Sequence, residues 1–145
     1  MMSTLQNNLP LKKDREILEG LQILAVDDNE DSLLLTSVIL EDYGITVTTA
    51  ISASEAFEKF KQSKPDILIC DITMPEKDGY WLIREIKKLE LEASEQTPAI
   101  ALTACARKED RILAIEAGFQ DHLTKPIEPD NLVQAVVTIV KRERK

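Results

Sequence analysis

Residues 66–75 read Asp66-Ile67-Leu68-Ile69-Cys70-Asp71-Ile72-Thr73-Met74-Pro75, and this stretch decides the fold. Positions 67–70 are apolar throughout, as expected of a strand that is buried on both faces of a parallel sheet. The apolar run is closed by a carboxylate at Asp71, and Met74-Pro75 follows shortly after it. The stretch therefore predicts a buried parallel strand that ends in an acidic residue.

Four other runs of strand length lie on either side of this one, with helical patterns between them. Five strands that alternate with five helices predict an α/β fold, in which a doubly wound parallel sheet has right-handed crossovers and helices on both faces. The expected strands are Gln22–Val26, Thr46–Thr49, Ile67–Cys70, Ala99–Leu102 and Asp121–Leu123.

The segments between the strands carry helix signals. Ser52 and Glu55 form a capping-box pattern, in which each side chain accepts a hydrogen bond from the other residue's free amide. The last segment starts at Pro129 and has an apolar stripe of one Leu and four Val residues (132, 133, 136, 137 and 140), which would pack on the sheet. The other helix boundaries are predicted at Gly44, at Asp78-Gly79, and at Gly118, which follows a helix over 108–117.

The chain of 145 residues fits one domain, which we expect over residues 21–145. Residues 1–20 are rich in polar and charged side chains, and we expect a flexible N-terminal extension with one short helical piece around Leu11–Glu19. The chain ends at Lys145, directly after the fifth helix, so we expect a stand-alone domain with no output domain attached.

The composition excludes several classes of protein. Apolar residues make up 43% and charged residues 30%, as in a globular protein, and the net charge is -8. An acidic surface of that size repels nucleic acid and anionic lipid, so we expect no direct nucleic-acid or membrane partner. The chain has no apolar run long enough to span a bilayer and no signal peptide, which predicts a cytoplasmic protein. Cys70 and Cys105 are interpreted as small buried apolar residues.

Polar residues stand at the carboxyl ends of four expected strands, where ligands bind in open parallel sheets. The first strand ends in Asp27-Asp28, the third in Asp71, the fourth in Thr103 and the fifth in Thr124-Lys125-Pro126. Three carboxylates at close quarters need a counter-charge, and Mg²⁺ with oxygen ligands meets that need. The cation, the lysine ammonium and the hydroxyl together can hold a phosphoryl group on a carboxylate, which predicts aspartyl-phosphate chemistry.

This constellation resembles the receiver domain of two-component response regulators over about residues 20–141. The resemblance implies a flavodoxin-like (βα)5 fold with strand order 2-1-3-4-5, the order of the chemotaxis receiver. The matching stretches are Ile-Leu-Ala-Val-Asp-Asp-Asn (23–29), Asp-Ile-Leu-Ile-Cys-Asp-Ile-Thr-Met-Pro (66–75), Asp-Gly-Tyr (78–80), Ala-Leu-Thr-Ala (101–104) and Lys-Pro (125–126).

The resemblance also implies a role for each residue of the expected site. Asp71 would be the phosphoacceptor, Asp28 a direct metal ligand, and Asp27 a ligand that acts chiefly through water. The backbone carbonyl of Thr73 would be a further metal ligand.

Three more positions take their roles from the same resemblance. Thr103 would act as a switch, because its hydroxyl would move toward the phosphoryl group once that group is attached. The ammonium of Lys125 would pair with the phosphoryl group. His122 falls where receivers usually carry an aromatic switch residue. The alternative interpretation is that His122 is a half-buried packing residue on a short strand. The Lys125-Pro126 peptide bond would be cis.

The expected function is a phosphorelay signalling protein whose partners are a histidine kinase or histidine phosphotransfer protein and a downstream protein. Such a protein is a phosphoacceptor that assists its own phosphorylation and dephosphorylation, rather than an enzyme. The surface of the last two helices and the last strand would bind the partner or a second copy. The alternatives are the receiver portion of a hybrid histidine kinase and, with less support, an aspartyl-phosphate phosphatase.

Two rival motifs fail on their spacing, and the phosphate loop that a third would need is missing after the first strand. Asp27, Asn29 and Asp31 resemble the start of an EF-hand loop, but Ser32 replaces the required glycine and Val38 the bidentate glutamate. A haloacid-dehalogenase-type phosphatase needs Asp-x-Asp after its first strand, whereas the two acids here are adjacent. A redox flavodoxin would need a Ser-, Thr- and Gly-rich phosphate loop after the first strand.

Overall fold

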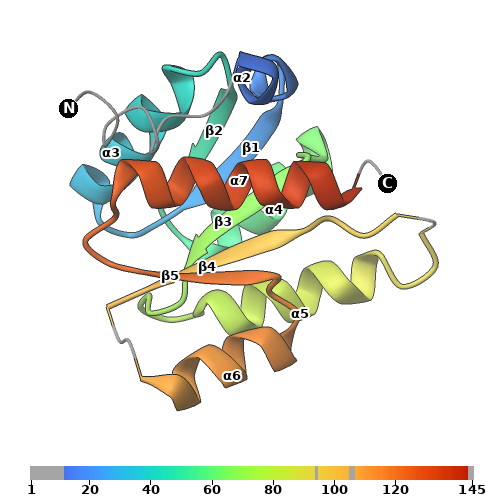
Figure 1. The fold of residues 1–145 in the computed structure, drawn as a ribbon. Coiled ribbons are helices and arrows are strands. Elements are labelled where there is room, and N and C mark those ends of the chain that lie inside the picture. The colour runs from blue at the N-terminus through green and yellow to red at the C-terminus, as the bar shows by residue number, and fades with distance from the viewer. Residues whose placement is uncertain (1–11, 94, 105–106, 144–145) are drawn as a thin grey trace.

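The fold is a five-stranded parallel sheet between two layers of helices (Figure 1). The computed structural model describes residues 12–93, 95–104 and 107–143. The strand order is β2-β1-β3-β4-β5, so the predicted doubly wound, flavodoxin-like arrangement is confirmed. The strands are β1 (Gln22–Val26), β2 (Thr46–Ala50), β3 (Ile67–Asp71), β4 (Ala99–Thr103) and β5 (Asp121–Thr124).

Four of the five strands extend one residue beyond the predicted end. At β3, β4 and β5 the added residue is polar, and it stays in register with its neighbours: Asp71 pairs with Leu102, and Thr103 pairs with Thr124. The ladder of backbone hydrogen bonds thus continues past the last apolar side chain. The functional side chains at this edge are therefore attached to regular strand, and their positions are fixed by the sheet.

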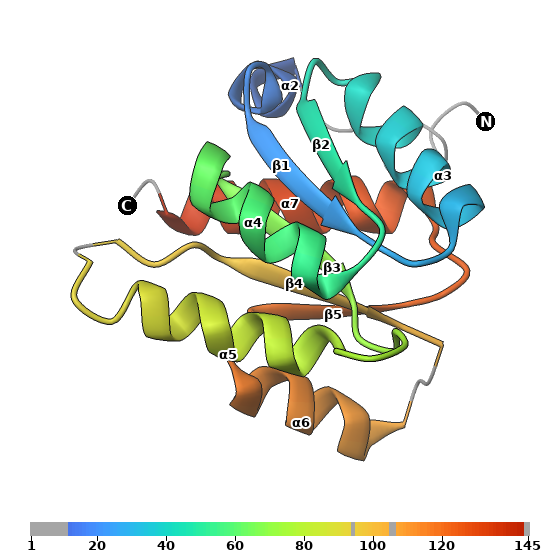
Figure 2. The same ribbon diagram turned by 180° about the vertical axis from the view of Figure 1, so that it is seen from behind.

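The helices form two layers, and each layer covers one apolar face of the sheet (Figures 1 and 2). The two buried clusters hold side chains from opposite sides of the strands: Leu24 and Leu68 belong to one, and Ile23 and Ile67 to the other. The helices on one face are α4 (Ala53–Ser63), α5 (Gly79–Leu89) and α6 (Lys108–Ala117), and those on the other are α2 (Lys12–Leu18), α3 (Glu30–Glu41) and α7 (Pro129–Glu143).

The capping box predicted at the start of α4 is half correct. The amide of Glu55 donates to the Ser52 hydroxyl over 3.1 Å, as predicted. The Glu55 carboxylate, however, accepts from the amide of Ile51 over 2.7 Å instead of that of Ser52. The longer glutamate side chain therefore anchors the residue before the cap, and it still satisfies a free amide at the helix start.

Helix α2 packs against the domain through several contacts. Leu18 is fully buried in the cluster under α3 and α7, and Asp14 forms an ion pair of 3.0 Å with Lys141 on α7. The amide of Gly20 donates to the carbonyl of Gly44 over 2.9 Å. The expected helical piece is present, while residues 1–11 lie outside the described part and the flexibility of the extension stays a prediction.

Two further sequence-based expectations concern single features. Cys70 is buried, as expected, whereas Cys105 lies outside the described residues. None of the helices in the described part of the chain has the length and apolar character that crossing a membrane requires.

Candidate functional site

The carboxyl ends of β1, β3, β4 and β5 meet at one edge of the sheet, and the predicted site residues lie there. Asp27 and Asp28 follow β1, Asp71 is the last residue of β3, and Thr103 is the last residue of β4. Lys125 follows β5, and its amide donates to the carbonyl of Thr103 over 2.8 Å. The structure therefore brings together residues that are up to 98 positions apart in the sequence (125 − 27).

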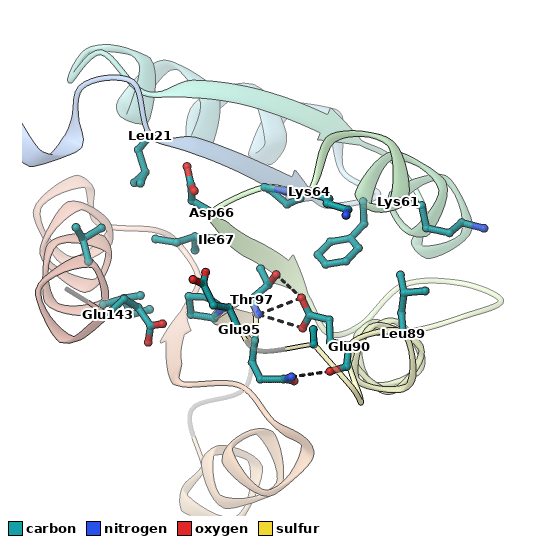
Figure 3. A pocket seen from close by; sticks show the side chains of 17 residues that line it. Leu21, Lys61, Lys64, Asp66, Ile67, Leu89, Glu90, Glu95, Thr97 and Glu143 are labelled. Atoms are coloured by element: carbon teal, nitrogen blue, oxygen red, sulfur yellow. Dashed lines mark hydrogen bonds between the residues drawn. The ribbon is translucent and has the colours of Figure 1, made fainter. Parts of the chain in front are cut away.

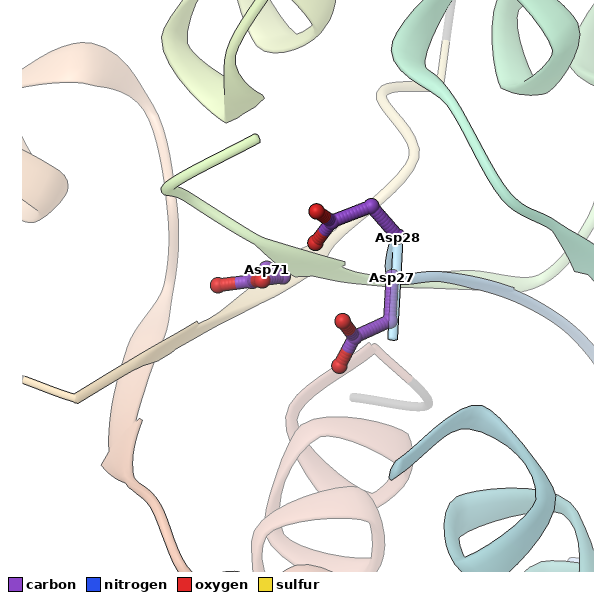
Figure 4. A group of neighbouring side chains, drawn as sticks. All are labelled: Asp27, Asp28 and Asp71. Carbon is purple, nitrogen blue, oxygen red and sulfur yellow. The ribbon is translucent and has the colours of Figure 1, made fainter. Parts of the chain in front are cut away.

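Three carboxylates converge at this edge (Figure 4). Asp27, Asp28 and Asp71 each offer an oxygen, and these oxygens all lie within 4.8 Å of one another. Asp27 and Asp71 are buried, with 1% and 5% of their surface exposed, whereas Asp28 is exposed. The cluster is therefore buried at Asp27 and Asp71 and reaches solvent at Asp28.

The ammonium of Lys125 neutralises part of the negative charge of these three carboxylates. Its Nζ lies 2.8 Å from Oδ2 of Asp27 and 3.3 Å from Oδ2 of Asp71. One ammonium against three carboxylates leaves a formal charge of about -2 when all three are ionised. That residual charge and the all-oxygen donor set fit a hard divalent cation such as Mg²⁺.

The surroundings of Asp71 shift the pKa of its carboxyl group. Burial and, next, the charge of Asp27 raise the pKa of Asp71 to about 6, although Lys125 and the amide of Thr73 act in the opposite direction. Burial lowers the pKa of Lys125, but its hydrogen bond to Asp27 and the charge of Asp71 outweigh that effect, so its pKa lies above the usual value. The lysine therefore stays positively charged beside a carboxylate that titrates near pH 6.

Backbone groups hold both buried carboxylates in place. The amide of Asn29 donates to Oδ1 of Asp27 over 3.0 Å, and the amide of Thr73 donates to Oδ1 of Asp71 over 3.3 Å. Behind Asp71, a Cβ on Gly79 would lie only 2.9 Å from the Asp71 carbonyl oxygen, so this position has no room for a larger residue. The chain thus turns tightly from β3 into α5 and leaves Asp71 as the last side chain of its strand.

Thr103 and His122 lie on the neighbouring strands β4 and β5, and both are buried. His122 is 8% exposed, so its expected half-burial is wrong. Its Nε2 has no hydrogen-bond partner among the described residues. Burial and the charge of Arg111 lower the pKa of His122, which keeps the imidazole neutral near pH 7.

Two features of the site were not predicted from the sequence. The ion pair of Lys125 with Asp27 requires the sheet order, which places β5 and β1 on either side of β3 and β4. A hollow of about 400 Å³ beside Thr73 and Thr103 is lined in part by Arg107, the residue before α6. The available signal for it was the position of Arg107, four residues after the end of β4 and directly before the helix predicted from Lys108.

The Lys125-Pro126 peptide bond is cis, as predicted. A cavity of about 820 Å³ lies at the opposite edge of the sheet (Figure 3). It is lined by the start of β3, the end of α4 and the turn after α5, and none of the predicted site residues lines it.

Comparisons with known proteins agree with this geometry. The family described as "Response regulator receiver domain" matches residues 23–137. An uncharacterized 14.6 kDa protein of Leptolyngbya boryana is 45% identical over 121 residues, which cover 83% of this chain and 91% of that protein. The alkaline phosphatase synthesis transcriptional regulatory protein PhoP of Bacillus subtilis is 33% identical over 83% of this chain, which spans only 49% of that regulator.

A solved structure shows the same fold. The crystal structure of a putative response regulator from Chloroflexus aurantiacus has a TM-score of 0.78 and 33% sequence identity. The match covers 85% of this chain and 99% of that chain. Nearly the whole of that response regulator is thus matched by the greater part of this chain.

Proposed function

Because this chain belongs to the response regulator receiver domain family of two-component systems, we propose that it accepts a phosphoryl group on Asp71 and thereby changes which protein it binds. The donor is a histidine kinase or a histidine phosphotransfer protein. The observation that supports this proposal most directly is the buried Asp71 carboxylate at the end of β3, with Lys125 and two further carboxylates around it.

The transfer makes one bond and breaks one. A carboxylate oxygen of Asp71 attacks the phosphorus, and the bond between phosphorus and the imidazole nitrogen of the donor histidine breaks, so the electron pair leaves with that nitrogen. Since the pKa of Asp71 is about 6, most of the carboxylate is ionised and nucleophilic at pH 7. The chain is thus a phosphoacceptor that assists its own phosphorylation and later hydrolysis.

The acidic pocket supplies the ligands for Mg²⁺. Asp28 and Asp71 would bind the ion directly, Asp27 chiefly through water, and the backbone carbonyl of Thr73 would complete the protein ligands. When bound, the ion neutralises the carboxylates and the incoming phosphoryl oxygens. Lys125, which already contacts Asp71, would pair with a phosphoryl oxygen in the product.

Thr103 and His122 would carry the signal to the surface. A phosphoryl group adds about -1.5 to -2 charges, and the buried Thr103 hydroxyl can move toward it as a hydrogen-bond donor. That motion vacates space behind β4, and the ring of His122 on the paired strand β5 can swing inward to fill it. The resulting change would reach the surface of α6, β5 and α7, which we propose as the site for the downstream partner.

Phosphorylation by a small phosphodonor with Mg²⁺ tests the proposal. The wild-type protein should incorporate phosphate, whereas Asp71→Asn should not, because the nucleophile is lost. Asp28→Ala should also fail, because a metal ligand is lost, and Asp31→Asn, an exposed acid in the first turn of α3, should behave as wild type. Full incorporation by Asp71→Asn would overturn the assignment.

A further inference from the structure

His122 is the single histidine of the chain, and it lies on β5, the strand at one edge of the sheet. Helix α6 packs against this strand (Figures 1 and 2). His122 pairs in register with Ala101 of β4, whose side chain belongs to the same buried cluster as Ala114 of α6. Because side chains alternate along a strand and paired residues of parallel strands share a face, the imidazole lies on the face that α6 covers.

The buried imidazole has an unpaired nitrogen. Only 8% of His122 is exposed, and its Nε2 has no hydrogen-bond partner among the described residues. A neutral imidazole loses one hydrogen bond in this position. The protonated ring carries two N–H donors and a positive charge, and burial of that charge without a partner is far more unfavourable. The buried position is therefore suited to the neutral ring alone.

Charged groups on α6 and β5 act on this ring. Burial and, next, the charge of Arg111 on α6 lower the pKa of His122, whereas Asp110 on α6 and Asp121 on β5 act in the opposite direction. The paired strand β4 has no titratable side chain, and α7 packs on the opposite face of β5. On α5, Lys87 lies at the C-terminal end of α6. Burial and the neighbouring guanidinium thus both disfavour the protonated ring, and the two carboxylates compensate only in part.

Helix α6 is held on the sheet by few buried side chains. Of its 10 residues, all of which the structure describes, Ala114 is the one that is buried. By contrast, four of the 11 residues of α5 and seven of the 15 residues of α7 are buried. Ile112, Leu113 and Ile115 of α6 are 46–53% exposed. Elements with few buried apolar contacts open locally at a low free energy, so a change in the ring that α6 covers is expected to loosen this helix first.

We propose that the protonation state of His122 controls how firmly α6 packs on the sheet. The neutral ring stays buried on the face that α6 covers. Acidification from pH 7 to about 5 protonates the ring, moves it toward solvent past the edge strand β5, and loosens α6. This opening does not depend on phosphorylation. Its consequence for signalling rests on the proposed function: a ring displaced by its charge cannot fill the space behind β4, so acidic pH should oppose the phosphorylated state.

An NMR titration of the full chain tests the proposal, since its imidazole signals can come only from His122. The titration is run on Asp71→Asn, because the Asp71 carboxyl itself titrates at about pH 6. No phosphodonor is present, so the outcome does not depend on the proposed function. We expect the imidazole to titrate below the ordinary value of about 6.5. The backbone amides of α6 should follow the same curve, whereas those of α4, which α5 separates from α6, should not.

Two substitutions in the same background change the charge on the ring and beside it. His122→Phe keeps a buried ring that cannot be protonated, so the amides of α6 should lose their response to pH. Arg111→Gln removes the neighbouring cation, so the midpoints of the imidazole and α6 curves should rise together. The matched control is Arg142→Gln, which removes an exposed cation from α7 on the other face of the sheet and should leave both midpoints unchanged.

Three results would overturn the proposal. The first is an imidazole that titrates at or above about 6.5. The second is a set of α6 amides that does not follow the imidazole, and the third is an unchanged α6 response in His122→Phe. If His122→Phe does not fold, Arg111→Gln decides, because Arg111 is exposed and its loss leaves the core intact. Midpoints that stay at the value of the parent protein in Arg111→Gln would then contradict the proposal, and a joint rise would support it.

Discussion

Asp71 shares a buried edge of the sheet with Asp27, and the ammonium of Lys125 contacts both. Burial raises the pKa of Asp71 to about 6, so the folded protein holds this proton more tightly than the unfolded chain does. The Asp71 carboxylate therefore lowers the free energy of unfolding progressively as the pH rises from about 4 to about 6. The buried carboxylate that makes Asp71 a nucleophile thus makes the metal-free protein less stable at neutral pH.

Asp71→Asn should accordingly be more stable than wild type in EDTA at pH 7, by on the order of 2–3 kcal/mol. The gain should fall to a small fraction of this near pH 4, where the wild-type carboxyl is protonated in the folded protein and about half protonated in the unfolded chain. Urea unfolding at the two pH values measures it, with the exposed Glu116→Gln as a control that should show no such pH dependence. A variant that is less stable than wild type at pH 7 would contradict this account of Asp71.

Gly79 is the residue that permits the tight turn behind Asp71. A Cβ at this position would lie 2.9 Å from two backbone atoms, the Asp71 oxygen and the Ile72 Cα, and neither can move as a side chain would. Gly79→Ala should therefore cost about 1–3 kcal/mol in the free energy of unfolding and should also lower Mg²⁺ affinity by displacing Asp71. Gly20 has a positive φ, but the space around it is open. Gly20→Ala should therefore lower the free energy of unfolding and leave Mg²⁺ affinity unchanged.

Among the elements, α2 lies outside the matched family region of residues 23–137 yet packs against it. Because Leu18 is fully buried under α3 and α7, Leu18→Ala should lower the free energy of unfolding by about 2–4 kcal/mol. Leu34→Ala on the exposed side of α3 should change it by about 0.5 kcal/mol or less. Equal effects of the two substitutions in chemical denaturation would show that α2 does not contribute to the fold.

In the proposed switch, Thr103 at the end of β4 carries the change from the site to the partner surface. Thr103→Ala should still accept phosphate on Asp71 but lose most of the gain in partner affinity that phosphorylation brings. His122→Ala should also weaken this coupling, and because only 8% of His122 is exposed we expect a larger effect than a half-buried ring would give. The two quantities, phosphate incorporation and partner affinity, are measured on the same protein samples, and unchanged coupling in Thr103→Ala would rule out this route.

The same elements show what the sequence can predict. The apolar strand ended by Asp71 was recognisable because a buried parallel strand is apolar on both faces, and the strand ends followed from it. The packing of α2 was not recognisable, because its one buried leucine stands among charged residues without a clear stripe. The hydrogen bond that Glu55 accepts in the capping box also differs from the prediction. Its side chain is long enough to reach either of two neighbouring amides, and it accepts from Ile51 rather than Ser52.

At the scale of the whole molecule, the sheet order assembles the site from four strand ends. The convergence of Asp27, Asp71, Thr103 and Lys125 was predictable, since the carboxyl ends of parallel strands share one edge. The contact of Lys125 with Asp27 was not, because it depends on how far a flexible side chain reaches across the sheet.

Locating the phosphoryl group on the chain tests the central claim most directly. The protein is phosphorylated by a small donor with Mg²⁺, the acyl phosphate is reduced with borohydride, and the peptides are analysed by tandem mass spectrometry. We predict that position 71, and neither Asp27 nor Asp28, is converted to homoserine, and that EDTA prevents the conversion. Homoserine at position 27 or 28, or labelled protein with no homoserine at position 71, would contradict the account.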